Sequence, residues 1–142
     1  MIDPRSPNFA STPIAPDRAK FAYAPLLSDA PRGGTLPPLP PAATIVTPYF
    51  NTGEVFHETA RCVLGQSLQQ FEWIIVNDHS TDAAALAVLD EYRELSKRDR
   101  RIRVIDHKSN HGLSAARNTG FREARSPYVF MLDSDDLIEP TA

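Results

Sequence analysis

The sequence predicts an α/β domain built on a doubly wound, mainly parallel sheet. Short β-branched or apolar runs of strand length alternate with longer stretches in which apolar residues recur at helical spacing. Strands that alternate with helices join through right-handed crossovers, which make the strands parallel and place helices on both faces of the sheet. The alternation starts near residue 42, and the 41 residues before it differ in composition.

Four runs predict strands. All four are rich in apolar residues, as strands covered on both faces should be. The first run is followed by Pro48, which cannot donate to a strand ladder, and the fourth leads straight into the acidic cluster Asp133–Asp136. We therefore expect strands at residues 43–47, 71–77, 102–105 and 127–132.

Three stretches between these strands predict helices, because their apolar residues recur three or four positions apart. The expected helices cover residues 54–68, the stripe from Ala85 to Leu95, and residues 113–124. Ser80 or Thr81 is suited to cap the second of these helices, and Asp82 suits its first turn.

The first 41 residues predict a leader without regular structure. Ten of the 13 prolines lie in this segment, and proline sustains neither a helix interior nor a central strand. We expect residues 1–41 to be disordered and locally extended. The segment carries a charge of +1, and subtracting it from the net charge of −3 leaves −4 for residues 42–142. This mildly acidic balance suits a metal-dependent site better than an anion-binding surface.

Length and composition restrict the function classes. A chain of 142 residues with 42% hydrophobic residues suits one globular domain. The net negative charge argues against a nucleic-acid binder, and a single cysteine, Cys62, excludes a disulfide framework. No apolar run is long enough to span a bilayer and no secretory signal is visible, so we expect a cytoplasmic protein. Peripheral association with a membrane stays open.

Polar residues follow the predicted strands at the edge where such sheets bind ligands. Asn51 follows the first strand, Asp78 ends the second, Asn110 follows the third, and the acidic cluster follows the fourth. Asp78 could accept hydrogen bonds from a ribose hydroxyl or a base N–H. Tyr49 and Phe50 offer aromatic surface at the same edge, or else pack in the core.

The acidic cluster has two interpretations. Asp133, Asp135 and Asp136 are carboxylates whose like charges raise one another's pKa, and a bound Mg²⁺ or Mn²⁺ would remove that cost. Alternatively, the cluster is an acidic loop that caps the following turn. Arg117 borders the apolar stripe of the third helix and needs an anionic partner, which the acidic cluster, Asp78 or a bound phosphate could supply.

Five motifs stand in order along the folded part of the chain: Thr47–Asn51 (TPYFN), Gln66–Leu68 (QSL), Trp73–Asp82 (WIIVNDHSTD), Asn110–Asn118 (NHGLSAARN) and Leu132–Asp136 (LDSDD). Taken together, in this order and at this spacing, they resemble family 2 glycosyltransferases of the GT-A fold. The resemblance implies a Rossmann-like domain and an enzyme that moves a sugar from a nucleotide-diphosphate donor to an acceptor hydroxyl, usually with inversion.

The resemblance also implies roles for single residues. Asp133-Ser134-Asp135 matches the family's DxD motif, in which Asp135 holds the divalent metal on the diphosphate. Asp133 then contacts the ribose or a metal-bound water, as a second residue of the metal site. Asp78 matches the acidic residue that contacts the base, and the loop that lines the base pocket is matched by Pro48 and Phe50.

Further positions match less fully. Asn51, Arg117 and Asn118 match positions that are often present in the family, and the resemblance implies donor-site roles, less well defined, for Asn51 and Arg117. Asn77 and His79 replace the Asp and Gly that are common in the family's second strand motif, which predicts a base pocket altered in detail. A UDP-sugar is the donor that we favour, and the sequence gives neither the sugar nor the acceptor.

Domains of this family continue well past the DxD motif, through an acceptor half that carries an Asp or Glu general base. This chain ends at Ala142, so no general base can be named, and we expect an incomplete donor-binding half-domain over residues 42–142 that is inactive alone. Two alternatives stay open: a truncated, non-catalytic product that binds nucleotide, and a nucleotidyltransferase. The second is disfavoured because the loop over residues 48–53 lacks Lys and Arg.

Overall fold

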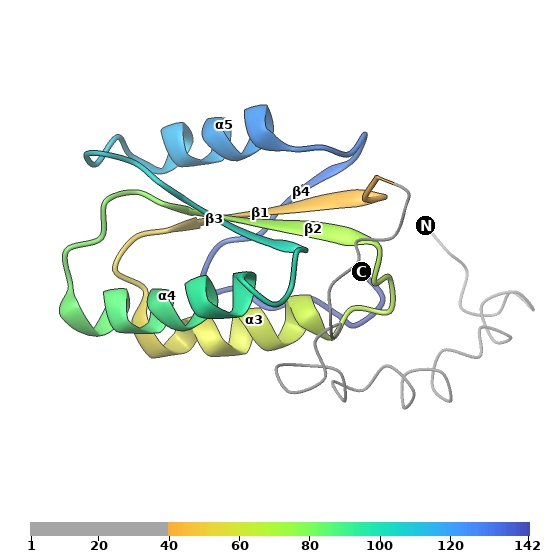
Figure 1. The fold of residues 1–142 in the computed structure, drawn as a ribbon, viewed down its shortest axis with the longest axis horizontal. Helices are drawn as coiled ribbons and strands as arrows, with labels where there is room; N and C mark the ends of the chain where they lie inside the picture. The colour runs from red at the N-terminus through yellow and green to blue at the C-terminus, as the bar shows by residue number, and fades with distance from the viewer. Residues whose placement is uncertain (1–39) are drawn as a thin grey trace, which may run out of the picture.

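The computed structural model describes residues 40–142, which form alternating strands and helices as predicted (Figure 1). The leader expected over residues 1–41 lies outside the described residues, apart from Pro40 and Pro41. The elements in chain order are β1 (Ala43–Tyr49), the 3-10 turn η1 (Gly53–Val55), α3 (Phe56–Leu64), β2 (Phe71–Asn77), α4 (Ala83–Ser96), β3 (Ile102–Asp106), α5 (Leu113–Glu123) and β4 (Val129–Met131).

The four strands form one parallel sheet in the order β3-β2-β1-β4. The chain moves outward from β1 to β3 and then returns to the other side of β1, so the strand order switches between β1 and β4. α3 and α4 cover one face of the sheet, and α5 covers the other (Figure 1). This arrangement confirms the predicted α/β class with a doubly wound parallel sheet.

The larger part of the core lies between the sheet and the helices α3 and α4. The buried ring of Phe56 is 4.9 Å from the ring of Tyr49, 5.6 Å from that of Trp73 and 4.9 Å from that of Tyr92, measured between centroids. The smaller cluster under α5 consists of Val46, Ile74, Val76 and Ala116. Both clusters include residues of β1, which is therefore covered on both faces.

The helix bounds and one cap differ from the sequence prediction. α3 ends at Leu64 rather than residue 68, because the chain turns at Gly65. The N-cap of α4 is Asp82, whose carboxylate accepts a hydrogen bond from the Ala85 N–H at 2.8 Å. The prediction that Ser80 or Thr81 caps α4 was therefore wrong. The Ser80 hydroxyl instead accepts the N–H of Asn51.

Two strand bounds also differ. β1 continues through Pro48 to Tyr49, since a proline removes one ladder donor but is compatible with extended backbone. β4 covers only Val129–Met131 of the six residues expected, and three of its residues pair with β1. β4 is thus a short strand at the edge of the sheet.

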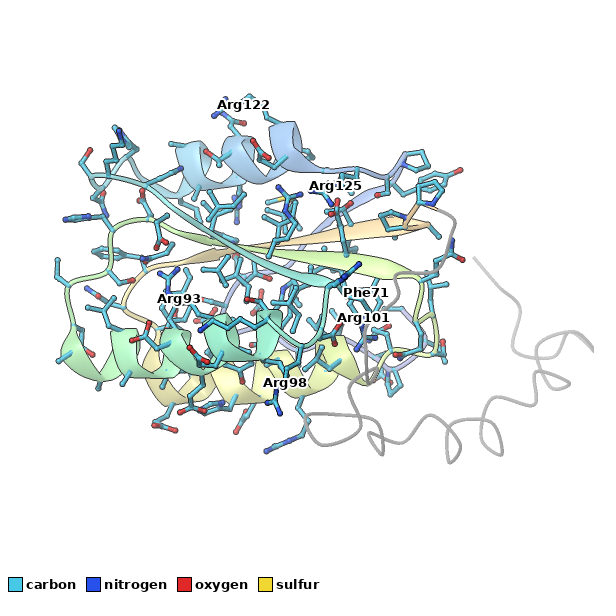
Figure 2. All side chains as sticks on the ribbon, viewed as in Figure 1. Phe71, Arg93, Arg98, Arg101, Arg122 and Arg125 are labelled. Atoms are coloured by element: carbon cyan, nitrogen blue, oxygen red, sulfur yellow. The ribbon has the colours of Figure 1, made fainter. Side chains whose placement is uncertain are left out.

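Charged residues near the amino ends of the strands are paired within the fold. Arg101 is buried beside Asp99, with 2.6 Å between Nη2 and Oδ2. Its guanidinium carbon lies 4.9 Å from the centroid of the Phe71 ring (Figure 2). The buried carboxylate of Glu72 accepts hydrogen bonds from the Thr44 hydroxyl and the Arg125 N–H. These charges hold the strands and loops at this end of the sheet.

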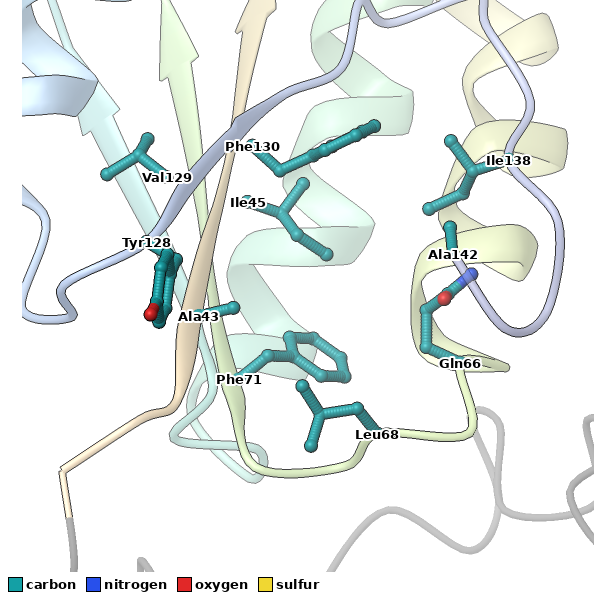
Figure 3. Close-up of a pocket in the computed structure, with 10 residues that line it drawn as sticks. All are labelled: Ala43, Ile45, Gln66, Leu68, Phe71, Tyr128, Val129, Phe130, Ile138 and Ala142. Atoms are coloured by element: carbon teal, nitrogen blue, oxygen red, sulfur yellow. The ribbon is translucent and has the colours of Figure 1, made fainter. Parts of the chain in front are cut away.

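A mainly apolar cavity of about 240 Å³ opens at this same end, beside β4 (Figure 3). Its lining residues are Ala43, Ile45, Gln66, Leu68, Phe71, Tyr128, Val129, Phe130, Ile138 and Ala142. Among the described residues that line it, Gln66 is the one polar side chain besides the Tyr128 hydroxyl. Within residues 40–142, no helix is both long enough and apolar enough to cross a membrane.

Candidate active site

A second, larger cavity of about 420 Å³, which we call the polar cavity, opens at the carboxyl ends of β1, β2 and β4, beside the start of α5. Ligand sites in doubly wound sheets lie at this edge, next to the switch in strand order. The lining residues are Pro48, Tyr49, Phe50, Asp78, Asn110, Gly112, Leu113, Ala116, Asp133, Ser134 and Asp135. Five residues predicted for the site from the sequence therefore meet in one cavity: Pro48, Phe50, Asp78, Asp133 and Asp135.

Asp78 forms a buried wall of this cavity and is 3% exposed. Its Oδ1 accepts the His111 N–H at 2.9 Å and lies 2.7 Å from Nδ1 of His107. Its Oδ2 accepts the Gly112 N–H at 2.7 Å. Burial alone would raise the pKa of the Asp78 carboxyl, but the hydrogen bonds from His111, His107 and Gly112 outweigh it and hold the pKa below its usual value. Asp78 is therefore an ionised, oriented acceptor at neutral pH.

The two aromatic residues after β1 have different environments. Tyr49 is fully buried, and its hydroxyl donates to the carbonyl oxygen of Ala85 at 2.6 Å. Phe50 is 49% exposed at the cavity. Of the two open interpretations, core packing applies to Tyr49, and the accessible ring at the site is that of Phe50.

The acidic cluster after β4 is held in place by two threonines, one in the loop after β1 and one on α3. The buried Thr59 on α3 donates its hydroxyl to the carbonyl oxygens of Ser134 and Asp136, at 3.1 and 2.7 Å. The hydroxyl of Thr52 bonds to that of Ser134. These contacts fix the backbone of the cluster and leave the carboxylates of Asp133 and Asp135 at the cavity.

Arg117 on α5 finds its anionic partner in the acidic cluster. Its Nη2 donates to Oδ1 of Asp133 at 2.8 Å. Its Nε is buried and has no hydrogen-bond partner, although a buried guanidinium nitrogen normally has one. Arg117 thus borders the cavity through Asp133, with one donor still available.

Asn51 lies outside the cavity, in the loop after β1. Its backbone has a φ of 52°, in the left-handed region that asparagine tolerates. Its side-chain oxygen accepts the N–H groups of Thr81 and Asp82, at 2.8 and 2.9 Å. His79 also lies in the left-handed region, with a φ of 61°, where glycine would be unstrained. Asn51 therefore joins the loop after β1 to the start of α4.

Sequence reasoning did not assign several residues that shape this site. Asn110, Gly112 and Leu113 line the cavity, and His107 supports Asp78 from behind. Asn110 also donates its side-chain amide to the Asp78 carbonyl oxygen at 3.2 Å. The signal available was position alone, since all four follow β3 at the carboxyl edge of the sheet. The fold is needed to show that this loop closes over Asp78.

Asp133 and Asp135 are the side chains that could hold a cation. Both offer carboxylate oxygens, which are the ligands preferred by Mg²⁺ and Mn²⁺. Residues 40–142 contain no group of three or more His, Cys, Asp or Glu side chains arranged to hold a metal ion. A pair of carboxylates fits a cation whose remaining ligands come from phosphate and water.

Comparison with known proteins identifies the relatives of the chain. Glycosyltransferase EpsJ of Bacillus subtilis (strain 168), described as uncharacterized, is 40% identical over 98 residues, which are 69% of this chain and 27% of EpsJ. The poly(ribitol-phosphate) β-N-acetylglucosaminyltransferase TarP of Staphylococcus aureus (strain N315) is 39% identical over 103 residues, which are 70% of this chain and 30% of TarP. The chain thus spans less than a third of the length of these relatives.

Solved structures with this fold include one complex with UDP and one with GDP-Man. Residues 1–349 of S. aureus TarS in complex with UDP match with a TM-score of 0.60 and 25% identity, over 70% of this chain and 29% of that one. The mannosyltransferase PcManGT from Pyrobaculum calidifontis, bound to GDP-Man and Mn²⁺, has a TM-score of 0.58 at 21% identity, over 85% of this chain and 34% of that one. These matches confirm the predicted GT-A fold.

The family assignment follows from the sequence match together with the fold. Residues 44–142 match the sequence model of the family described as glycosyl transferase family 2. That range contains the whole sheet apart from the first residue of β1, and every residue that lines the polar cavity. The chain therefore belongs to glycosyl transferase family 2.

Proposed function

We propose that residues 44–142 bind the nucleotide and diphosphate of a nucleotide-diphosphate sugar, and that the whole enzyme transfers the sugar to an acceptor hydroxyl with inversion. The observation that carries this proposal is the polar cavity, which combines a buried ionised carboxylate, an accessible aromatic ring and two further carboxylates. Family membership and the UDP complex of the similar TarS domain support it.

We propose that Phe50 and Asp78 receive the base. The exposed ring of Phe50 offers an apolar face against which a planar base can pack. A carboxylate has about four acceptor positions, and three of those on Asp78 are used within the fold. The remaining position, on Oδ2, suits a base that presents an N–H, as uracil and guanine do. The same oxygen would repel the lone pair of the unprotonated N3 that cytosine presents in place of the N–H of uracil. A UDP-sugar is the donor that we favour.

We propose that Asp133 and Asp135 bind Mg²⁺ or Mn²⁺ together with the diphosphate. Both carboxylates line the same cavity as Asp78, and Arg117 fixes the orientation of Asp133. When bound, the cation supplies neutralisation of the charge that develops on the leaving diphosphate. The guanidinium of Arg117 is the positive group beside Asp133, which it contacts through Nη2. We assign Asp135 as the principal metal ligand, because its exposed carboxylate has no partner among residues 40–142.

We propose that the acceptor site and the general base lie in a part of the whole enzyme that corresponds to the unmatched length of the relatives. The relatives are more than three times as long as the matched segment. The expectation that residues 1–142 alone give no turnover stays a prediction. The cytoplasmic location and any peripheral association with a membrane also stay predictions.

Titration calorimetry of the 142-residue chain with UDP, in Mn²⁺ and in EDTA, tests the donor site. We expect UDP to bind more tightly in Mn²⁺. Asp135→Asn should reduce the affinity in Mn²⁺ to its level in EDTA, whereas the neighbouring Asp136→Asn, whose side chain lies outside the cavity, should behave like the wild type. Circular dichroism checks that each variant is folded.

Two outcomes count against the proposal. Equal affinity for UDP in Mn²⁺ and in EDTA would refute the metal assignment and leave the nucleotide site standing. Failure of a folded wild-type chain to bind UDP or GDP under either condition would refute the donor site as a whole.

A further inference from the structure

We propose that His107 is a positioning residue that fixes which oxygen of Asp78 faces the base. The inference rests on the proposed function, because it assumes that Asp78 contacts the base of the donor. His107 does not line the cavity, so it acts through Asp78 rather than on the ligand.

The His107 ring is held at both of its nitrogens. The residue directly follows β3, and its N–H donates to the Asn77 carbonyl oxygen at 2.9 Å, which extends the pairing of β2 and β3. The side chain is 12% exposed. Its Nδ1 lies 2.7 Å from Oδ1 of Asp78, and its Nε2 lies 2.8 Å from the Thr119 hydroxyl on α5. The ring therefore bridges the end of β2 and α5.

The bonding partners determine the tautomer of the neutral ring. Asp78 is ionised and can only accept, so Nδ1 of His107 must carry the hydrogen. Nε2 then accepts a hydrogen bond from the Thr119 hydroxyl. One tautomer satisfies both contacts, and this gives the bridge a defined direction.

The consequence for Asp78 is an unequal use of its two oxygens. Oδ1 accepts from His107 and His111 and is filled, whereas Oδ2 accepts from Gly112 alone. The two N–H donors belong to adjacent residues of one loop, so they move together. His107 is the independent third donor that stops rotation of the carboxylate. Without it, Oδ1 regains an acceptor position, and the carboxylate is held only by the loop that carries His111 and Gly112, which fixes its orientation toward the base less firmly.

The loss of His107 should therefore weaken recognition of the base N–H more than it weakens contacts with the rest of the nucleotide. The probes are UDP and its N3-methyl derivative, which lacks the imide hydrogen, titrated in Mn²⁺ by calorimetry. The measured quantity is the ratio of the two affinities. A general loss of folded protein lowers both affinities and leaves their ratio unchanged.

We expect the wild-type chain to prefer UDP, and His107→Ala to reduce that preference about tenfold, as for the loss of one charge-assisted contact. His107→Asn should restore part of the preference, because its amide N–H can occupy the position of Nδ1–H. His57→Ala is the matched control. His57 also uses its Nδ1 in a hydrogen bond, to the Tyr92 hydroxyl at 2.6 Å, but lies outside the cavity. This control should keep the wild-type ratio.

Each contrary outcome has a distinct meaning. An unchanged ratio in folded His107→Ala overturns the inference and makes His107 a structural residue only. If His107→Ala does not fold, the affinity ratio of UDP to its N3-methyl derivative is measured for His107→Asn instead. A ratio about tenfold below that of the wild type then overturns the donor role of Nδ1. Equal binding of both probes by the wild type overturns base recognition by Asp78, and with it the inference, but not donor binding. Absence of UDP binding by the wild type is instead a failure of the proposed function.

Discussion

Gly120 lies where α5 approaches the sheet most closely, and adding one methyl group there should destabilise the domain. A Cβ built on Gly120 would lie 2.1 Å from Cγ1 of Val46, 2.9 Å from Cγ2 and 3.0 Å from Cβ. Ordinary contacts between carbon atoms measure about 3.5–4.0 Å, so the helix would have to move by about 1.5 Å. Val46 is fully buried in the central strand β1 and has no free space into which to turn.

The expected change in the free energy of unfolding combines two opposing effects. Helix propensity alone favours Gly120→Ala by about 1 kcal/mol. Overpacking of a filled core costs about 1–3 kcal/mol and occasionally more, and the overlap here is severe. We therefore expect a net loss of about 1–2 kcal/mol. In urea this lowers the unfolding midpoint by about 1 M, at an unchanged slope.

The double variant Val46→Ala/Gly120→Ala tests the cause. Val46→Ala alone removes two buried methyl groups, at a cost of about 2 kcal/mol. It also removes both methyl groups that meet the new Cβ and leaves only the contact at 3.0 Å. The two changes together should cost about 1 kcal/mol less than their sum. Asn118→Ala, on the exposed side of α5, is the control and should change stability by no more than about 0.7 kcal/mol. A stabilised Gly120→Ala variant, or strict additivity in the double variant, would refute this reasoning.

Two further predictions concern charge. Hydrogen bonding to Arg93 lowers the pKa of Asp106, and the loop donors lower that of Asp78 despite its burial. Both carboxylates therefore bind a proton more readily in the unfolded chain than in the folded one. Their contribution to the free energy of unfolding is fully present above about pH 5 and is lost as the pH falls through about 4 toward their lowered pKa values. Urea midpoints measured from about pH 6 to about pH 3 should show this fall, and Asp106→Asn should reduce it; a flat profile for the wild type would contradict the assignment. Arg117→Met should lower UDP affinity in Mn²⁺ about tenfold while stability stays within about 1 kcal/mol, since a buried unpaired nitrogen is removed along with the partner of Asp133. If the loss in free energy of unfolding equals the loss in free energy of UDP binding, Arg117 serves the fold alone.

The sequence was sufficient for the fold because its signals are local and agree with one another. Each strand is an apolar run, each helix has an apolar stripe, and each strand leads into polar residues at its carboxyl end. Parallel topology then brings residues such as Phe50, Asp78 and Asp135 to one edge, although they are far apart in sequence. Pattern and topology together were enough to bring five of the predicted residues to the cavity: Pro48, Phe50, Asp78, Asp133 and Asp135.

The rest depends on contacts that no local pattern encodes. His107 supports Asp78 only because β3 pairs with β2 in one register, which a strand's own composition does not reveal. Asn51 follows β1 as the other polar residues follow their strands, yet its side chain turns toward the start of α4. The choice of Asp82 as the cap of α4 likewise depends on Ser80, which is already occupied by Asn51. Competition among neighbours decides such cases.

The loops around the polar cavity are joined to one another by hydrogen bonds within the chain. Asn51 ties the loop after β1 to the start of α4, and Asp78 ties the end of β2 to the loop after β3. The conformational entropy of these segments is therefore lost when the chain folds and not again when a nucleotide arrives. The association rate should accordingly be high and proportional to the nucleotide concentration. The heat-capacity change of binding should be small and negative, because it is set by the apolar surface of Phe50 and Leu113 that the base covers. Affinity in this domain is thus partly determined during folding.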